Sequence, residues 1–207
     1  ACTNECPSNV NMSLIKAELL HARIQRGHLT MQQRLISSVD FIGRIGTNIP
    51  SLANWLLNRR SVRHISGQMF GLTGERSLLE FTNERFDRWF AKHQSQTPPH
   101  RGRVILWDDT FVRYHEPHIG RAAVAVLEAA GFAVTLVGRR KCCGRPAFSV
   151  GHLELAEKLG RHNLALLAGG DDNEPILFLE PSCYSMFAED YRELKLPDAE
   201  AVAARCY

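Results

Sequence analysis

The sequence has no long hydrophobic run and no strong charge bias. No apolar stretch approaches the roughly 20 residues that a transmembrane helix needs, and no signal peptide is recognisable. The net charge is only +3 over 207 residues, without a Lys/Arg run or a basic and aromatic stripe. We therefore expect no transmembrane segment, no nucleic-acid partner and a cytoplasmic location, with peripheral attachment to the inner membrane as the alternative.

Cysteine is also sparse. Six cysteines in 207 residues are too few for a disulfide scaffold, and their clustering favours ligands in a reducing compartment. The remaining composition, 44% hydrophobic and 23% charged, is that of an ordinary globular protein. The chain begins with Ala1 rather than Met. We expect it to be part of a longer polypeptide, and homo-oligomerisation stays open.

Two adjacent cysteines, Cys142 and Cys143, form the most distinctive motif. Gly144 and Pro146 favour a sharp turn after them, because glycine tolerates positive φ and proline fixes its own. Basic residues surround the pair, and positive charge lowers the pKa of a thiol and favours the thiolate. These residues are Arg139, Arg140, Lys141 and Arg145. The sequence thus predicts a thiolate site for a metal or a redox group.

A second cysteine motif stands at the start of the chain. Cys2 and Cys6, followed by Pro7, match the second half of the bacterial ferredoxin run. In that run the last cysteine binds a different cluster from the one before it. We interpret Cys2 and Cys6 as ligands of two different 4Fe–4S clusters.

The first 95 residues are predicted to be all-helical. One helix is expected from Asn11 or Ser13 to Arg26, and a second over residues 29–42 that ends at Gly43 and Gly46. Further helices are expected from Pro50 and after Asn83, with residues 61–80 irregular or short-helical. Residues 96–102 are predicted to form a linker.

Residues 103–207 show the alternation of strands and helices that is typical of an α/β domain. The predicted strands are residues 104–107, 133–137 and 175–179, with helices over residues 117–130, 151–168 and from about Tyr184. Right-handed crossovers between them give a βαβαβα unit with a parallel sheet in three layers.

A polar loop follows each predicted strand. The loops are Asp108-Asp109-Thr110, Cys142-Cys143-Gly144 and Glu180-Pro181-Ser182-Cys183. Because the carboxyl ends of parallel strands share one edge, Thr110, Cys142, Cys143 and Cys183 are expected to converge on one pocket there.

Residues 103–207 resemble the cysteine-rich "CCG" domain of heterodisulfide reductase subunits and of proteins for glycerol-3-phosphate, glycolate and lactate oxidation. Cys142-Cys143-Gly144 and Cys183 match that pattern. Thr110, 32 residues before Cys142, and Glu180 stand where the family has cysteines. Two of five expected thiolates are therefore replaced.

Four longer segments resemble the C-terminal part of FAD-linked oxidases of the D-lactate and D-2-hydroxyglutarate dehydrogenase type, which carry fused ferredoxin and CCG modules. The segments are Trp107-Asp108-Asp109-Thr110-Phe111, Tyr114-His115-Glu116-Pro117, Cys142-Cys143-Gly144-Arg145-Pro146 and Leu179-Glu180-Pro181-Ser182-Cys183-Tyr184. The resemblance implies that residues 1–95 are the tail of a helical ferredoxin module and that residues 103–207 are half of a CCG-domain pair.

The resemblance also implies a function. FAD in a domain outside this chain would oxidise a 2-hydroxyacid, and iron–sulfur clusters would pass the electrons to an acceptor that the sequence does not identify. Cys142, Cys143 and Cys183 would hold a cluster, supported by Asp109, Thr110, Gly144, Arg145 and Glu180.

Two alternatives stay open. Three thiolates and one carboxylate or imidazole can bind zinc tetrahedrally, and the candidate fourth ligands are Asp109, Glu180, His115 and His118. Alternatively, the loss of two cysteines leaves a degenerate CCG module with a structural or docking role.

Overall fold

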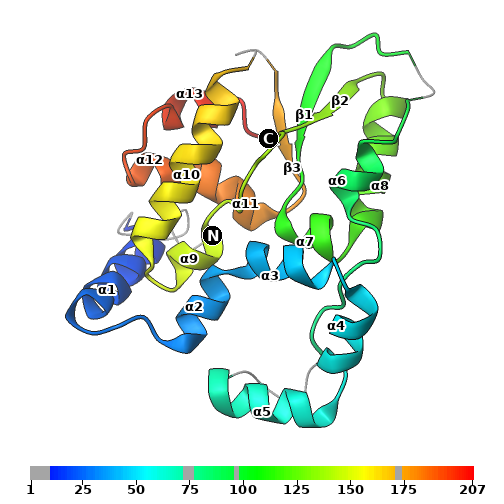
Figure 1. Ribbon diagram of the computed structural model, residues 1–207. Helices are drawn as coiled ribbons and strands as arrows, with labels where there is room; N and C mark the ends of the chain where they lie inside the picture. Colours follow the sequence, from blue (N-terminus) through cyan, green and yellow to red (C-terminus); the bar gives the residue numbers. More distant parts are fainter. Residues whose placement is uncertain (1–9, 72–76, 96–97, 171–173) are drawn as a thin grey trace.

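The structure is a computed structural model that describes residues 10–71, 77–95, 98–170 and 174–207. A small sheet stands between two layers of helices, and a separate group of helices from the first half of the chain lies beneath it (Figure 1). The predicted fold class, a helical segment followed by a parallel α/β domain in three layers, is confirmed.

The sheet has three strands, β1 (Arg103–Trp107), β2 (Ala133–Leu136) and β3 (Ile176–Phe178). Their order is β2-β1-β3, and both neighbours run parallel to β1. The chain end adds to the β3 edge, where Cys206 forms a parallel bridge with Ile176. The strands lie within a residue or two of the predicted ranges because their apolar runs are short and end at polar loops.

Side chains of β1 alternate between the two helical layers. Leu106 packs in a cluster with Phe86, Val112 and Val124 on the side of α8 (Pro117–Ala129). Ile105 and Trp107 pack on the other side, in the cluster that contains Leu164 and Leu167 of α10 (Leu153–Ala168). The central strand is thus buried on both faces, as parallel sheets require.

A short helix comes after each strand, following the polar loop. These helices are α7 (Thr110–Tyr114), α9 (Arg145–Ser149) and α11 (Pro181–Ser185). The last helix therefore begins at Pro181 and not near Tyr184 as predicted. It continues through a π-helical turn, η1 (Met186–Asp190), to α12 (Tyr191–Glu193), and α13 (Ala199–Ala203) completes the fold. These turns place the polar loops at the carboxyl edge of the sheet.

The first half of the described chain is helical, as predicted. Its elements are α1 (Met12–Arg26), α2 (Met31–Ser37), α3 (Val39–Gly46), α4 (Pro50–Leu57), α5 (Arg60–Phe70) and α6 (Phe86–Phe90). Asn11 caps α1 by accepting a hydrogen bond from Leu14 N, and Thr30 with Gln33 forms a capping box on α2.

One prediction for this region is wrong. Gly43 does not end a helix but lies inside α3, which ends at Gly46. Added Cβ atoms at Gly43 and Gly46 would lie 2.5 Å from the rings of Tyr114 and Phe81, so both glycines also allow close packing. For residues 61–80 the sequence left irregular and short-helical structure open, and residues 60–70 form one regular helix, α5.

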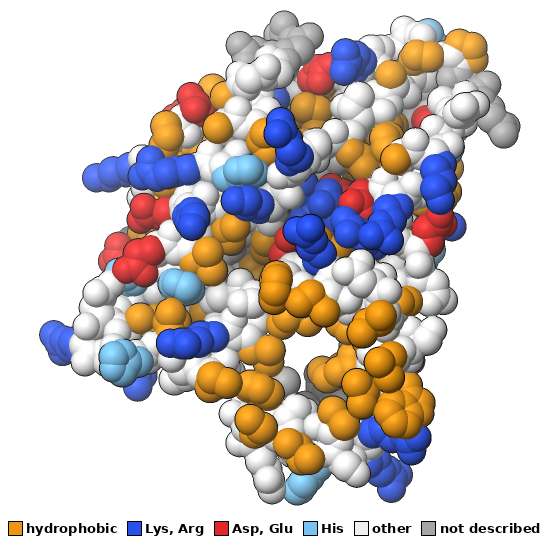
Figure 2. Space-filling view, in the orientation of Figure 1, with side chains coloured by type: hydrophobic (Ala, Val, Ile, Leu, Met, Phe, Trp, Pro, Cys, Tyr) orange, Lys and Arg blue, Asp and Glu red, His pale blue; other side chains and the backbone are white. Residues whose placement is uncertain are grey.

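Helices α3 to α5 leave many apolar side chains exposed. Figure 2 shows hydrophobic side chains gathered over the lower, helical part of the visible face. Among the exposed residues there are Phe41, Ile45, Ile49, Leu52, Trp55 and Leu56. No described helix has both the length and the apolar character needed to cross a membrane.

The predicted linker over residues 96–102 stays a prediction, and the structure adds two observations near it. Phe86 of α6 is buried in the same cluster as Leu106 of β1. His100 and Arg101 both donate backbone hydrogen bonds to Gly131 O, at 2.9 and 3.0 Å. Contacts with the α/β layers therefore begin before β1.

Candidate functional site

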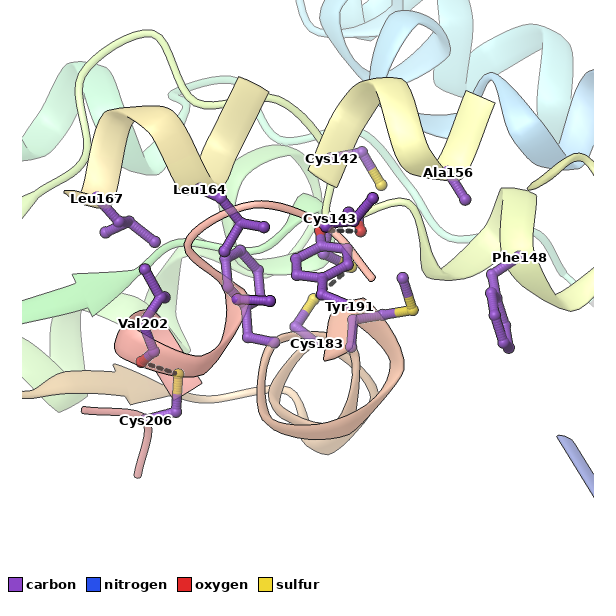
Figure 3. Packing of buried hydrophobic residues seen from close by; sticks show 14 of the residues in the cluster. Cys142, Cys143, Phe148, Ala156, Leu164, Leu167, Cys183, Tyr191, Val202 and Cys206 are labelled. Atoms are coloured by element: carbon purple, nitrogen blue, oxygen red, sulfur yellow. Dashed lines mark hydrogen bonds between the residues drawn. The ribbon is translucent and has the colours of Figure 1, made fainter. Parts of the chain in front are cut away.

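Two of the cysteines form a close pair at the carboxyl edge of the sheet. The sulfur atoms of Cys143, in the loop after β2, and Cys183, in α11 after β3, lie 3.0 Å apart. Both side chains are buried. Figure 3 shows the pair beside the ring of Tyr191, with Cys142 nearer to α10 and Cys206 well away from all three.

Cys142 and Thr110 extend this pair. Cys142 Sγ is in hydrogen-bonding reach of Cys143 Sγ, of the Thr110 side chain and of the Gly144 N–H. The Arg145 N–H approaches the Cys143 sulfur in the same way. The structure thus brings Thr110, Cys142, Cys143 and Cys183 together in one buried cluster, here called the thiol cluster. Their role as ligands stays a prediction.

Gly144 shapes the loop that carries the two adjacent cysteines. It has φ of +84°, in the left-handed region, and its Cβ would lie 3.2 Å from Ala156 Cα in α10. A side chain there would be both strained and crowded. The turn predicted from the sequence therefore depends on glycine for two reasons.

Two buried side chains hold this loop from outside. Asn163 of α10 accepts a hydrogen bond from Lys141 N at 2.9 Å and donates to Lys141 O at 3.2 Å and Cys142 O at 3.0 Å. The Tyr191 hydroxyl donates to Cys143 O. The backbone of the cysteine pair is thus tied to two other elements of the α/β domain.

The expectation of activated thiolates is wrong for this state of the protein. The hydrogen bond with Cys143, together with burial, raises the pKa of Cys142 well above its usual value. The bond with Cys142 lowers the pKa of Cys143, but the bond with Cys183 and burial outweigh it and raise that pKa well above normal. The raised pKa values favour the protonated thiol for both Cys142 and Cys143.

The basic neighbours do not activate the thiols because carboxylates already pair with the two nearest guanidinium groups. Arg140 is buried and bonds to Asp40 at 2.8 Å and to Asp108 at 3.3 Å. Arg145 bonds to Asp190 at 2.6 Å. Arg139 and Lys141 are exposed to solvent, where their charges are screened.

Asp108 organises a second buried cluster beside the first, here called the ion cluster. It pairs with Arg113 at 2.5 and 2.8 Å and also with Arg140, whose NH2 donates to Asp109 O at 3.2 Å. Burial alone would lower the pKa of Arg140, but Asp108 and Asp40 outweigh it and raise that pKa. Since Asp40 belongs to α3, this cluster joins the helical segment to the α/β domain.

The two supporting carboxylates have structural partners. Asp109 caps α7 by accepting hydrogen bonds from Phe111 N at 2.7 Å and Val112 N at 3.1 Å. Glu180 caps α11 by accepting from Ser182 N and Oγ, at 3.3 and 2.6 Å. Both carboxylates are therefore used as helix caps.

The donor set does not fit a metal site as it stands. Within the described residues, no group of three or more His, Cys, Asp or Glu side chains is placed to hold a metal ion. His115 bonds through Nδ1 to Glu80 O at 2.9 Å, and His118 is exposed. The zinc site predicted from Cys142, Cys143, Cys183 and a fourth ligand is thus not supported. Cys2 and Cys6 lie outside the described residues.

A 4Fe–4S cluster normally takes four thiolate ligands. The thiol cluster supplies only three cysteines, Cys142, Cys143 and Cys183, beside the oxygen side chains of Thr110 and Glu180. What the cluster of thiols can do directly is redox chemistry between sulfurs. Cys143 and Cys183 could close to a disulfide with loss of two protons and two electrons to an external oxidant.

Sequence reasoning missed the residues that position the site. Asn163 had a detectable signal, because it is a polar residue on the stripe of α10 that contains Ala156, Gly160 and Leu167. Nothing in the sequence pairs Asp108 with Arg113 and Arg140. Asp190 ends a π-helical turn and Tyr191 follows it, and no sequence pattern predicts that turn.

Residues 110–188 match the family model of the cysteine-rich domain called CCG. This range contains Thr110, the Cys142-Cys143-Gly144 loop and Cys183, which are the residues that the structure brings together. This part of the chain is thus similar to CCG cysteine-rich domains.

The similarity to characterised proteins extends beyond residues 110–188. The chain is 24% identical over 190 residues to one component of the anaerobic glycerol-3-phosphate dehydrogenase of Escherichia coli (strain K12), covering 91% of this chain and 48% of that protein. It is 33% identical over 87 residues to lactate utilization protein A of Bacillus cereus (strain B4264), covering 42% of this chain and 35% of that one. The chain thus spans at most about half the length of these relatives. No solved structure is detectably similar to it.

Proposed function

We propose that this chain is the electron-transfer segment of a larger oxidoreductase. In this proposal FAD, bound elsewhere in the same polypeptide, oxidises a 2-hydroxyacid such as D-lactate or D-2-hydroxyglutarate. The electrons then leave through iron–sulfur modules toward an acceptor. The CCG domain over residues 110–188 supports this proposal, as do relatives named for a dehydrogenase component and for lactate utilization.

The observation that carries the proposal is the retained thiol cluster. Cys143 and Cys183 come from loops 40 residues apart and still lie with their sulfurs 3.0 Å from each other. Hydrogen bonds from the buried side chains of Asn163 and Tyr191 fix the loop that carries Cys142 and Cys143. Such preorganisation favours a site that uses sulfur chemistry over two cysteines that only fill space.

The proposal assigns different tasks to the two cysteine motifs. Cys2 and Cys6 would ligate 4Fe–4S clusters together with cysteines outside this chain. Cys142, Cys143 and Cys183 would form the exit side of the path, binding at most a partial cluster or one metal because Thr110 and Glu180 offer only oxygen.

A second function, a docking module without a cofactor, is favoured by one specific observation. Asp109 and Glu180 are both engaged as helix caps, so neither carboxylate is free to complete a ligand set. In that case the CCG domain would only join the flavin and ferredoxin parts to their partner.

Anaerobic reconstitution with iron and sulfide tests the site in this chain. We expect no 4Fe–4S cluster, and at most one metal or a partial cluster that is lost in Cys143→Ser and Cys183→Ser but kept in Cys206→Ser. Iron and labile-sulfide assays measure this. A stoichiometric 4Fe–4S cluster that survives Cys142→Ser but disappears in Cys2→Ser would overturn the assignment.

Electron delivery in the whole protein separates the two functions. If the thiol cluster is on the path, Cys183→Ser should leave flavin reduction by the 2-hydroxyacid unchanged and slow the transfer of electrons to an artificial acceptor. Stopped-flow absorbance of the flavin follows both steps. Unchanged transfer in Cys183→Ser and in Cys143→Ser would favour the docking module.

A further inference from the structure

A cavity of about 600 Å³ lies where the helical segment meets the α/β domain. Ser38 and Phe41 line it from α3 and the residue before, Tyr114 from α7, and Leu155 and Leu159 from α10. Cys142 of the thiol cluster lies on its wall. Its volume falls in the range of small-molecule sites, which is about 300–1,000 Å³.

The charges that line this cavity are almost all positive. Figure 2 shows Lys and Arg side chains gathered across the middle of the visible face. Six cationic residues line the cavity, and one carboxylate, Asp40, faces them. The six are Arg44, Arg85, Arg113, Arg139, Arg140 and Lys141.

Three of these cations have carboxylate partners and are held in place by them. Arg113 and Arg140 share Asp108, Arg140 also bonds to Asp40, and Arg85 bonds to Asp87 at 2.5 Å. Arg113 and Arg140 are also buried. They form a fixed floor of guanidinium groups whose charges are balanced by Asp108 and Asp40.

The other three cations, Arg44, Arg139 and Lys141, are exposed and have no ion pair among the described residues. Arg139 lies at the rim of the cavity. Its backbone is in the left-handed region, with φ of +57°, and His162 Nε2 lies 3.0 Å from its carbonyl oxygen. Three unpaired cations around one cavity, above a floor whose charges are balanced, leave an excess of positive charge that matches a small polyanion.

We propose that this cavity binds a small organic anion that carries at least two phosphate or carboxylate groups. Guanidinium groups bind both chemistries through the same paired hydrogen bonds. The inference goes beyond the proposed electron-transfer function and does not depend on any iron–sulfur group. A ligand here would touch both halves of the chain and would lie against Cys142.

Calorimetric titration of the chain with pyrophosphate and, separately, with citrate tests this inference. We expect one site per chain for at least one of these probes, and the comparison of the two distinguishes a phosphate ligand from a carboxylate ligand. In Arg139→Ala/Lys141→Ala, the affinity should fall about tenfold or more, because two charged contacts are lost. Asp40→Asn removes the carboxylate of the cavity and should tighten binding.

Lys16→Ala/Arg23→Ala is the matched control, since it removes two exposed cations of α1 that do not line the cavity. Its affinity should equal that of the unmodified chain. Equal losses in the two double variants would mean general attraction to a basic protein and would overturn the proposal. Absence of binding for both probes would overturn it as well.

Discussion

The ion cluster and the thiol cluster lie side by side at the same edge of the sheet, yet they differ in how completely their groups are paired. In the ion cluster Asp108 bonds to two guanidinium groups, and Arg140 finds a second carboxylate and a backbone carbonyl. In the thiol cluster the sulfurs mainly contact one another.

This difference indicates different roles. A buried charge that loses its partner costs several kcal/mol, so a fully paired ion cluster is a structural joint. Thiols tolerate incomplete pairing because they are weakly polar and behave almost as small hydrophobic groups. The thiol cluster can therefore keep reactive groups buried without destabilising the fold.

The largest expected effect comes from breaking the ion cluster. Asp108→Asn removes the charge that holds Arg113 and Arg140 and should lower the free energy of unfolding by about 3–5 kcal/mol. Urea denaturation measures this. Glu157→Gln is the control: Glu157 forms a partly exposed pair with Arg161 at 3.7 Å, and its loss should cost less than about 0.5 kcal/mol. Similar effects for both variants would mean that Asp108 is not a structural joint.

A smaller loss of stability is expected when the side chain that supports the Cys142-Cys143 loop is removed. Asn163→Ala leaves the backbone groups of Lys141 and Cys142 unpaired, and should cost about 2–3 kcal/mol because unsatisfied buried groups keep their desolvation penalty. Asn58→Ala, which removes an exposed hydrogen bond to Glu80, should change stability by less than about 0.5 kcal/mol. Alkylation of Cys142 should also become faster in Asn163→Ala but not in Asn58→Ala. Mass spectrometry of the labelled peptide can follow this rate.

Gly144→Val tests the turn itself. The positive φ should cost about 1–2 kcal/mol, and the contact with Ala156 should displace the loop further. Gly138→Val is the matched control, because no atom lies within 4 Å of its Cβ position. Unchanged melting temperature and unchanged thiol reactivity in Gly144→Val would contradict the role given to this glycine.

Much of this architecture followed from sequence because local patterns determine it. Short apolar runs that end at polar loops define the three strands, and the parallel topology then brings Cys143 and Cys183 to one edge. The prediction at Gly43 is wrong for a physical reason: a glycine that allows a close approach looks the same in sequence as one that ends a helix. Only the position of the Tyr114 ring distinguishes the two.

The charge state of the thiols could not be predicted from neighbours along the chain. Arg140 and Arg145 stand next to the cysteines in sequence, but their guanidinium groups pair with Asp108, Asp40 and Asp190, which are distant in the chain. Burial and hydrogen bonds between the sulfurs then decide the pKa values. Long-range pairing of this kind has no local signature.

The smallest expected effect concerns Thr110, the hydroxyl side chain of the thiol cluster. Its side chain is buried and hydrogen-bonds to the Cys142 sulfur, an interaction that lowers the pKa of Cys142 against the larger effects that raise it. Thr110→Val keeps the shape and removes the hydroxyl, so it should cost only about 1 kcal/mol and should raise the pKa of Cys142 further. Because only the thiolate reacts, alkylation of Cys142 should slow at every pH below that pKa. Thr110→Ser, which restores the hydroxyl, should recover the rate. If Thr110→Val and Thr110→Ser alkylate at the same rate, the hydroxyl has no part in the thiol cluster, and the distinction drawn between the two buried clusters would rest on the cysteines alone.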